Sequence, residues 1–251
     1  MDLYGNLDQA FPGLQVGMDL NERVESGVAQ EKINFGYPVA GFVGEEEKVY
    51  NFHRDQASLT LSGVLVTSNV YTVTINGIEV SVTFATDHAT TMTALISAIN
   101  TDADVLALGD IEASAGSSNL ILIIKAKAKG LDLTVTGVVT AGASQATATV
   151  AYSTWAKFLG IAGFMQKGGR DFGAENSAYQ VNDSVNIISK GQRWVPVAVT
   201  VEDKEAAYII YAVGDNQGQF TNESSGNYDC GAYFRSNSSN GLAIVEVNGL
   251  K

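Results

Sequence analysis

The chain has 251 residues, of which 45% are hydrophobic and 17% are charged, and its formal net charge is −12. It holds enough apolar residues for a substantial core, which excludes a chain that is disordered throughout. The negative charge disfavours contact with nucleic-acid phosphates and anionic membranes, so we expect neither nucleic acid nor membrane as a partner. Twenty-six glycines and only three prolines, with abundant Val, Thr and Ser, favour a mainly β fold.

The first 32 residues are polar, and no apolar period of 2 or 3.6 persists in them. We therefore predict an extended N-terminal arm over residues 1–32, with Phe11 and Leu14 among its apolar anchors. The sequence leaves open whether this arm wraps its own subunit or reaches a neighbour. The opening sequence, MDLYGNLDQAFPG, lacks the basic and apolar segments of a signal peptide, so we expect synthesis in a cytoplasm.

Residues 71–84, YTVTINGIEVSVTF, predict a β-hairpin. Two alternating runs meet at Asn76-Gly77, the dipeptide that best tolerates the two positive φ values of a type I′ turn. Pairing the strands across this turn brings six apolar side chains onto one face. The expected pairs are Ile75 with Ile78, Val73 with Val80, and Tyr71 with Val82.

A helix is predicted directly after the hairpin, in TDHATTMTALISAIN. Thr86 or Asp87 can cap its N-terminus. Four apolar residues follow at positions i, i+3, i+4 and i+7, which is one face of a helix that can pack onto the hairpin. They are Met92, Leu95, Ile96 and Ile99. The next segment, NTDADVLALGD, lacks the ligands of a calcium loop, so we predict a loop that ends the helix.

Further strands are predicted in LILIIKAKAKG, LDLTVTGVVT and SQATATVAY. Lys125, Lys127 and Lys129 share one face of the first of these. They suit either an anion-binding stripe or, the interpretation that we favour, an edge strand protected against aggregation by its charges. Together with the hairpin and the helix, these strands make residues 55–152 a complete α+β module.

Glycine-punctuated strands resume after this module, in WAKFLGIAGFMQ, YQVNDSVNIIS, QRWVPVAVTV, EAAYIIYAVG and GLAIVEV. Their length and spacing are typical of a β-sandwich or a barrel-like, jelly-roll type fold. The sequence therefore predicts a discontinuous β domain of residues 33–54 and 153–251. The α+β module of residues 55–152 is inserted into it, so the two ends of the module should lie close together.

The motifs of common enzymes are missing from the sequence. The two histidines, His53 and His88, form no HExxH pair, and neither CxxC, GxSxG, GxGxxG nor GxxxxGK[ST] occurs. Cys230 is the only cysteine, and we interpret it as a small buried residue. We expect no catalytic residue, no metal site and no cofactor, although paired carboxylates of a glycosidase, which come from distant positions, leave an enzyme as a minor alternative.

Aromatic residues are frequent in the C-terminal part, and aromatic and arginine side chains dominate protein–protein contacts. Two places combine them. Arg193 is followed by Trp194, and Tyr233 lies two residues before Arg235.

The C-terminal part resembles the tailed-phage structural cement, or capsid decoration, proteins. The resemblance rests on FLGIAGF, YQVNDSVNIISKGQRWVPVAVTV and DCGAYFRSNSSNGLAIVEV, with RVESGVAQEKINFGYPVAG upstream, and it covers residues 20–50 and 155–250. The order of these motifs carries the resemblance more than any one of them. The inserted block, with YTVTINGIEV, is similar to a module of phage tail and surface proteins.

This resemblance implies a structural virion protein on the outer capsid surface, synthesised in the host bacterial cytoplasm. Its expected partners are the major capsid protein and further copies of itself, as a dimer or a trimer. The alternative is a tail or adhesin component that binds host glycans through the inserted module. The residues that we expect at a capsid or subunit interface are Phe11, Leu14, Arg23, Phe35, Arg193, Trp194, Tyr233 and Arg235.

Overall fold

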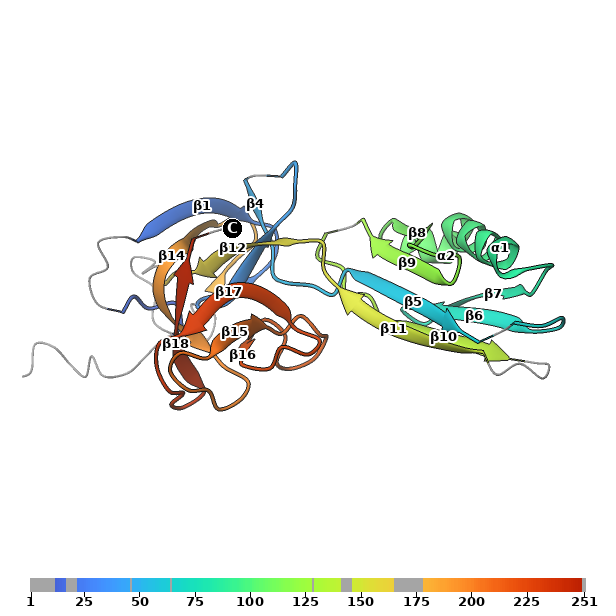
Figure 1. Ribbon diagram of the computed structural model, residues 1–251. Coiled ribbons are helices and arrows are strands. Elements are labelled where there is room, and N and C mark those ends of the chain that lie inside the picture. The colour runs from blue at the N-terminus through green and yellow to red at the C-terminus, as the bar shows by residue number, and fades with distance from the viewer. Residues whose placement is uncertain are drawn as a thin grey trace, which may run out of the picture. The chain divides into compact units, whose positions relative to one another are not determined.

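The computed structural model describes residues 12–16, 22–45, 47–63, 65–127, 129–140, 146–164 and 178–249. The chain folds into two compact units (Figure 1). Unit 1 holds the described residues up to Phe52 and those from Ala156 onward, and unit 2 holds His53–Trp155. Strands make up 48% of the structure and helices 9%, which confirms the expectation of a mainly β, barrel-like protein. Phe11 lies outside the described residues.

Unit 1 is built around one curled sheet, in which the described residues form nine strands in the order β16-β15-β17-β18-β14-β1-β4, with β12 and β3 joined to it through β14. A short two-stranded ladder, β2 with β13, lies beside it. The strands are β1 (Arg23–Ala29), β2 (Ile33–Asn34), β3 (Pro38–Gly41), β4 (Lys48–Val49), β12 (Lys157–Ala162), β13 (Ala178–Tyr179), β14 (Ser184–Pro196), β15 (Ala206–Ile209), β16 (Phe220–Thr221), β17 (Tyr228–Phe234) and β18 (Leu242–Asn248).

Strand β14 is the central strand of unit 1. Its first part pairs with β1 on one side and β12 on the other, and its second part pairs with β18. The sequence predicted two strands here, ending and starting around Gly191. The structure instead has one strand of 13 residues, in which every second residue from Val185 to Val195 is buried and Ile188 is buried as well.

Three strands of unit 1 were not expected from the sequence, namely β1, β17 and the two-residue strand β16. Strand β1 lies within the predicted arm and pairs antiparallel with β14. Its inward-facing positions are Glu25, Gly27 and Ala29, which carry too little apolar surface to show a period of 2. Strand β17 was missed because it carries two unpaired residues, Cys230 and Gly231, opposite the step from Ala207 to Tyr208 of β15, and this bulge interrupts its alternation.

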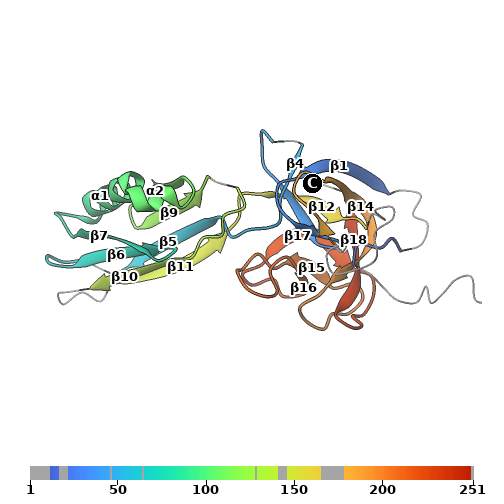
Figure 2. The ribbon, with the colours of Figure 1, turned by 180° about the vertical axis from the view of Figure 1, so that it is seen from behind.

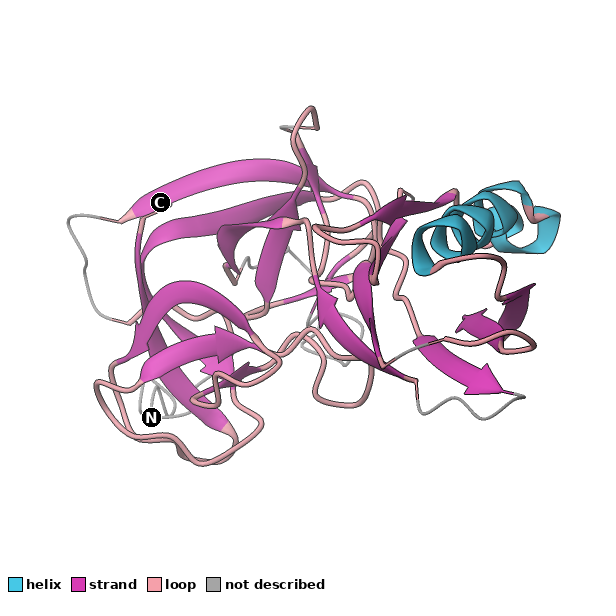
Figure 3. Ribbon diagram, turned by 45° about the vertical axis from the view of Figure 1, so that its right-hand side comes forward, coloured by secondary structure: helices cyan, strands magenta, loops and turns pink. Residues whose placement is uncertain are grey.

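Unit 2 contains two sheets and both helices of the described chain (Figures 2 and 3). One sheet has the order β11-β5-β9-β8 and the other β10-β6-β7. The elements are β5 (Gln56–Ser62), β6 (Val70–Ile75), β7 (Ile78–Thr83), α1 (His88–Thr101), α2 (Ala103–Ala107), β8 (Ile111–Ala115), β9 (Ile121–Ala126), β10 (Val135–Thr140) and β11 (Thr147–Ser153). Helix α1 packs against β7 and β8, so the two sheets and the helix enclose a core of their own.

The predicted hairpin is confirmed residue by residue. Asn76 and Gly77 have positive φ values of 46° and 90°, and β6 pairs with β7 in the expected register. The side chains of Tyr71, Val73 and Val80 are buried in the core of unit 2. The local sequence therefore determines both the turn and the face that is buried.

The predicted helix is also confirmed. The Asp87 carboxylate caps α1 by accepting a hydrogen bond of 2.7 Å from the backbone N–H of Thr90. Of the apolar stripe, Met92, Leu95 and Ile99 are buried in the same core as the hairpin. The next segment differs from the prediction, because Asp102 accepts hydrogen bonds from the N–H groups of Asp104 and Val105 and caps the short helix α2.

The prediction that Lys125, Lys127 and Lys129 lie on an edge strand is wrong, because only Lys125 lies on a strand, β9, and the other two follow its end. Strand β9 is bordered by β5 on one side and β8 on the other. The Lys125 ammonium lies 4.0 Å from the centre of the Trp155 ring, and that of Lys127 lies 3.5 Å from a carboxylate oxygen of Glu112. These two cations therefore have intramolecular contacts.

Candidate functional site

The outer face of β14, β18 and β17 gathers three of the expected interface residues. Trp194 lies directly opposite Ile244, and Tyr233 lies directly opposite Glu246. Residues that lie opposite each other, or two apart along a strand, share one face of a sheet. These four side chains therefore lie on one face, opposite to the buried residues Val195, Ala243, Val245 and Phe234.

Arg235 follows β17 and belongs to the same face. Its guanidinium forms an ion pair with the Glu246 carboxylate, and its backbone N–H donates 2.8 Å to the carbonyl oxygen of Ile244. Tyr233 is 45% exposed, which leaves its ring available to a partner. We call the five residues Trp194, Tyr233, Arg235, Ile244 and Glu246 the outer-face patch.

Arg193 is next to Trp194 in sequence but points to the opposite face. Its side chain is 5% exposed and forms an ion pair with Glu22. Its Nη1 also donates 2.7 Å to the carbonyl oxygen of Gln192. A buried cation needs such partners, so Arg193 holds the segment around Glu22 in place.

The described part of the N-terminal arm packs on its own unit. The Gly13 N–H donates 2.7 Å to the carbonyl oxygen of Trp194, and the Trp194 N–H donates 3.2 Å to that of Leu14. The Gly13 carbonyl oxygen accepts 2.9 Å from the Phe164 N–H. Residues 12–16 therefore run beside β14, where Gln15 pairs with Arg193 and Leu14 is half-buried.

Phe35 and Arg23 lie away from this face. Phe35 is 4% exposed and packs edge-on against Phe164 and Tyr179, at centroid distances of 5.4 and 5.0 Å. Arg23 lies on β1, where its Nε is 2.9 Å from a carboxylate oxygen of Glu25. The structure thus groups Trp194, Tyr233 and Arg235, while the interface role of all eight residues stays a prediction.

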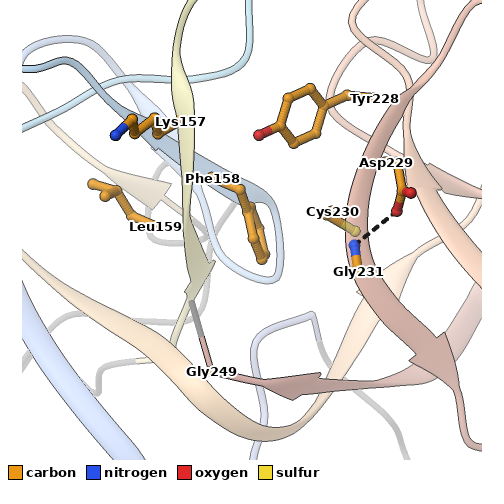
Figure 4. A pocket seen from close by; sticks show the side chains of 8 residues that line it. All are labelled: Lys157, Phe158, Leu159, Tyr228, Asp229, Cys230, Gly231 and Gly249. Carbon is orange, nitrogen blue, oxygen red and sulfur yellow. Dashed lines mark hydrogen bonds between the residues drawn. The ribbon is translucent and has the colours of Figure 1, made fainter. Parts of the chain in front are cut away.

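A pocket of about 480 Å³ opens between β12 and β17 (Figure 4). It is lined by Lys157, Phe158, Leu159, Tyr228, Asp229, Cys230, Gly231 and Gly249. The Cys230 thiol donates 3.1 Å to the Ala207 carbonyl oxygen, and burial raises the pKa of this thiol to about 12. It is therefore protonated at neutral pH and a poor nucleophile.

Two further properties bear on the kind of site. In the residues that the structure describes, no three His, Cys, Asp or Glu side chains lie close enough to hold a metal ion. None of the helices in the described ranges is long and apolar enough to cross a membrane. The distinctive feature of unit 1 is thus a broad sheet surface with aromatic and charged side chains.

Comparisons with known proteins identify the class of protein to which this chain belongs. Residues 95–248 match the family described as "Structural cement protein (E217 gp24/Pam3 gp6)". The match covers more than half of the chain, so the chain belongs to this family of phage structural proteins. It starts within α1 and includes part of unit 2, whereas the upstream resemblance in residues 20–50 lies outside it.

A comparison with curated proteins gives no match. Among solved structures, the chain is similar to one in "The capsid of Myoviridae Phage XM1", with 12% identity, a TM-score of 0.44 and full coverage of both chains. At that TM-score the likeness carries no argument about fold or function.

Proposed function

We propose that this chain binds the outer surface of a phage capsid and stabilises the shell by bridging neighbouring capsid subunits. The observation that supports it best is the outer-face patch, where three of the residues expected at an interface lie together on one face of a sheet. Membership of the structural cement protein family supports the capsid as the partner. In this proposal the protein is a component of the virion, made in the bacterial cytoplasm, and acts by binding rather than by catalysis.

The chemistry of the patch suits a protein partner. Trp and Tyr supply large contact areas with few rotatable bonds, and Arg adds charge-assisted hydrogen bonds at its rim. A stable interface buries about 1,600 Å² in total, which is more than these five residues provide. We therefore expect neighbouring loops, or additional copies of the chain, to contribute further contacts and avidity.

The experiment is co-sedimentation of purified variants with expanded capsids. We expect Tyr233→Ala and Trp194→Ala each to weaken binding about tenfold or more, as for residues at the centre of an interface. The matched control is Val138→Ala in unit 2, a 51% exposed residue that should bind like the wild type. Equal binding by all three variants would contradict the assignment of the patch.

The N-terminal arm needs a more careful test than removal of residues 1–32. That deletion would remove β1 and the bridge of Gln15 with Arg193, and it would damage unit 1 itself. Deletion of residues 1–11, which include Phe11, retains strand β1 and the bridge of Gln15 with Arg193. We expect this shorter deletion to weaken capsid binding without lowering the melting temperature of unit 1. If the shortened protein binds capsids with unchanged affinity, residues 1–11 do not contribute to capsid binding.

A further inference from the structure

Strand β1 has an open edge along most of its length. One side pairs with β14, and the other side pairs only with the two residues of β4, at Val28 and Ala29. The Val28 N–H donates 2.7 Å to Glu47, and the Gln30 N–H donates 3.0 Å to Val49. Residues 23–27 have no neighbouring strand on this side within the described part of the chain.

The backbone groups of this edge point outward. Successive residues of a strand direct their N–H and C=O groups to opposite sides. The Ala29 N–H donates 2.9 Å to Asp183, toward β14, so the odd-numbered residues face β14 and the even-numbered ones face the open edge. Val24 and Ser26 therefore present free N–H and C=O groups, for which the described residues hold no partner.

The side chains of β1 also suit a partner strand. Val24 is 51% exposed and Val28 is 37% exposed, both on one face of the strand. On the other face Arg23 and Glu25 form an ion pair of 2.9 Å. An unpaired edge of this kind is a template for another strand.

The charges of β1 are complementary to those of a second, antiparallel β1. With Val24 on the two-fold axis, Val24 lies opposite the second copy's Val24, and Arg23 lies opposite the second copy's Glu25. Opposite charges in directly facing positions stabilise a pair of strands, and like charges destabilise it. Shifting the axis to Glu25 would place two carboxylates opposite each other. Shifting it to Ser26 would place Val24 opposite Val28, whose edge is already paired with β4. The Val24 register is therefore preferred.

We propose that two copies of this chain associate through antiparallel pairing of their β1 edges, with Val24 on the two-fold axis. Such an interface is isologous and favours a dimer over a trimer. It does not depend on capsid binding, although a dimer would present two outer-face patches at once. Because a ladder of residues 22–26 in each copy buries less area than a standard interface, we expect an affinity of about 1–100 μM in solution.

The first experiment uses charge reversal and sedimentation velocity over a concentration series. Arg23→Glu and Glu25→Arg each place like charges opposite each other in the homodimer, so each variant alone should dimerise about tenfold more weakly than the wild type. An equimolar mixture should recover dimers, because each Glu then faces an Arg of the other chain. Each variant also breaks the ion pair between Arg23 and Glu25 within β1. If the loss of this ion pair were the cause of weaker dimerisation, mixing the two variants would not restore the dimer. A wild type that stays monomeric, or a mixture that behaves like the separate variants, would overturn the proposal.

The second experiment tests the register by disulfide formation under mild oxidation. Val24→Cys should give a covalent dimer, because the two thiols face each other across the axis. The matched control is Ser26→Cys, whose two thiols would lie four residues apart along the paired strands and out of reach. Cys230 is present equally in both variants. Equal cross-linking of the two variants, or none in either, would contradict the Val24 register.

Discussion

The Asp55 carboxylate accepts a hydrogen bond of 3.0 Å from the backbone N–H of Trp155, a residue one hundred positions later in the chain. Next to it, the Gln56 side chain donates 3.0 Å to the Ser153 hydroxyl, and β5 pairs with β11 from Gln56 to Ser62. Hydrogen bonds within unit 2 therefore join the beginning of this unit to its end. This closeness of its ends is what an inserted module requires.

The first prediction concerns pH and follows from the burial of Asp55. Desolvation raises the pKa of its carboxyl from 3.8 to about 6, against hydrogen bonds from Trp155 and Thr154 and the nearby His53, which lower it. A pKa that is raised on folding contributes stability below pH 3.8, and this contribution is lost as the pH rises through 6. The charged form should cost unit 2 about 2–3 kcal/mol at neutral pH.

Asp55→Asn removes this charge and keeps an oxygen that can accept from the Trp155 N–H. We expect the variant to unfold at a higher temperature than the wild type at pH 7.5 and at a similar temperature at pH 4. Thermal melts followed by circular dichroism at the two pH values measure the difference. Destabilisation of equal size at both pH values would show that the carboxylate is needed for its hydrogen bonds rather than penalised for its charge.

The second prediction concerns the docking of residues 12–16. Gly13 has a φ of +77°, and a Cβ atom there would lie 2.8 Å from backbone atoms of Ala162, Gly36 and Phe164. Gly13→Ala should therefore lower the free energy of unfolding by about 2 kcal/mol or more, or release the segment from β14. Urea unfolding of the variant measures this loss.

The control is Gly44→Ala. Gly44 has a similar φ of +85°, but a Cβ atom at this position would have no described neighbour within 4 Å. The variant should show only the backbone cost, about 1 kcal/mol. If both variants lose the same stability, the close packing of Gly13 plays no part.

The third prediction concerns the buried ion pair between Arg193 and Glu22. Arg193→Met leaves the Glu22 carboxylate without its cation and should cost about 3 kcal/mol in guanidinium unfolding. Adding Glu22→Gln should recover part of this loss, because no unpaired charge then remains. Arg235→Met serves as a comparison, since the Arg235–Glu246 pair is more exposed and should be worth about 1 kcal/mol or less. Equal losses in the two single variants would rule out an anchoring role for Arg193.

The fourth prediction treats unit 2 as an inserted module. Replacing residues 56–153 by a short Gly-Ser linker should leave unit 1 folded and able to bind capsids, because the segment begins and ends at paired residues. The isolated residues 53–155 should fold alone around their own core. Heteronuclear NMR spectra of the two pieces, compared with the full chain, test both statements. Loss of dispersed signals from either piece would show that the units need each other to fold.

The sequence predicted unit 2 better than unit 1 because its key signals are local. The Asn76-Gly77 turn and the Met92 stripe each lie within one short stretch, where periodicity determines the face that is buried. The pairing of β9 depends on β5 and β8, which lie elsewhere in the chain, so the strand that carries Lys125 was assigned to an edge although it lies inside its sheet. Strand β5 itself was not predicted, although it is a central strand of its sheet.

The candidate interface also depends on strand pairing that the sequence alone does not reveal. Trp194 and Tyr233 were chosen by residue type, and nothing in the sequence says that they share a face, because that depends on both strands pairing with β18. Arg193 was chosen with Trp194, yet alternation along β14 directs it to the interior. The open edge of β1 was not visible at all, since the strand itself was not predicted.

The central claim is that this protein stabilises a phage shell by binding to it. The most direct measurement is the temperature at which purified particles release their DNA, with the protein present, absent and added back. We predict that particles without it open at a lower temperature and that adding the wild-type protein, but not Tyr233→Ala, restores the original value. Particles that carry none of this protein, or that open at the same temperature in all three states, would contradict the account.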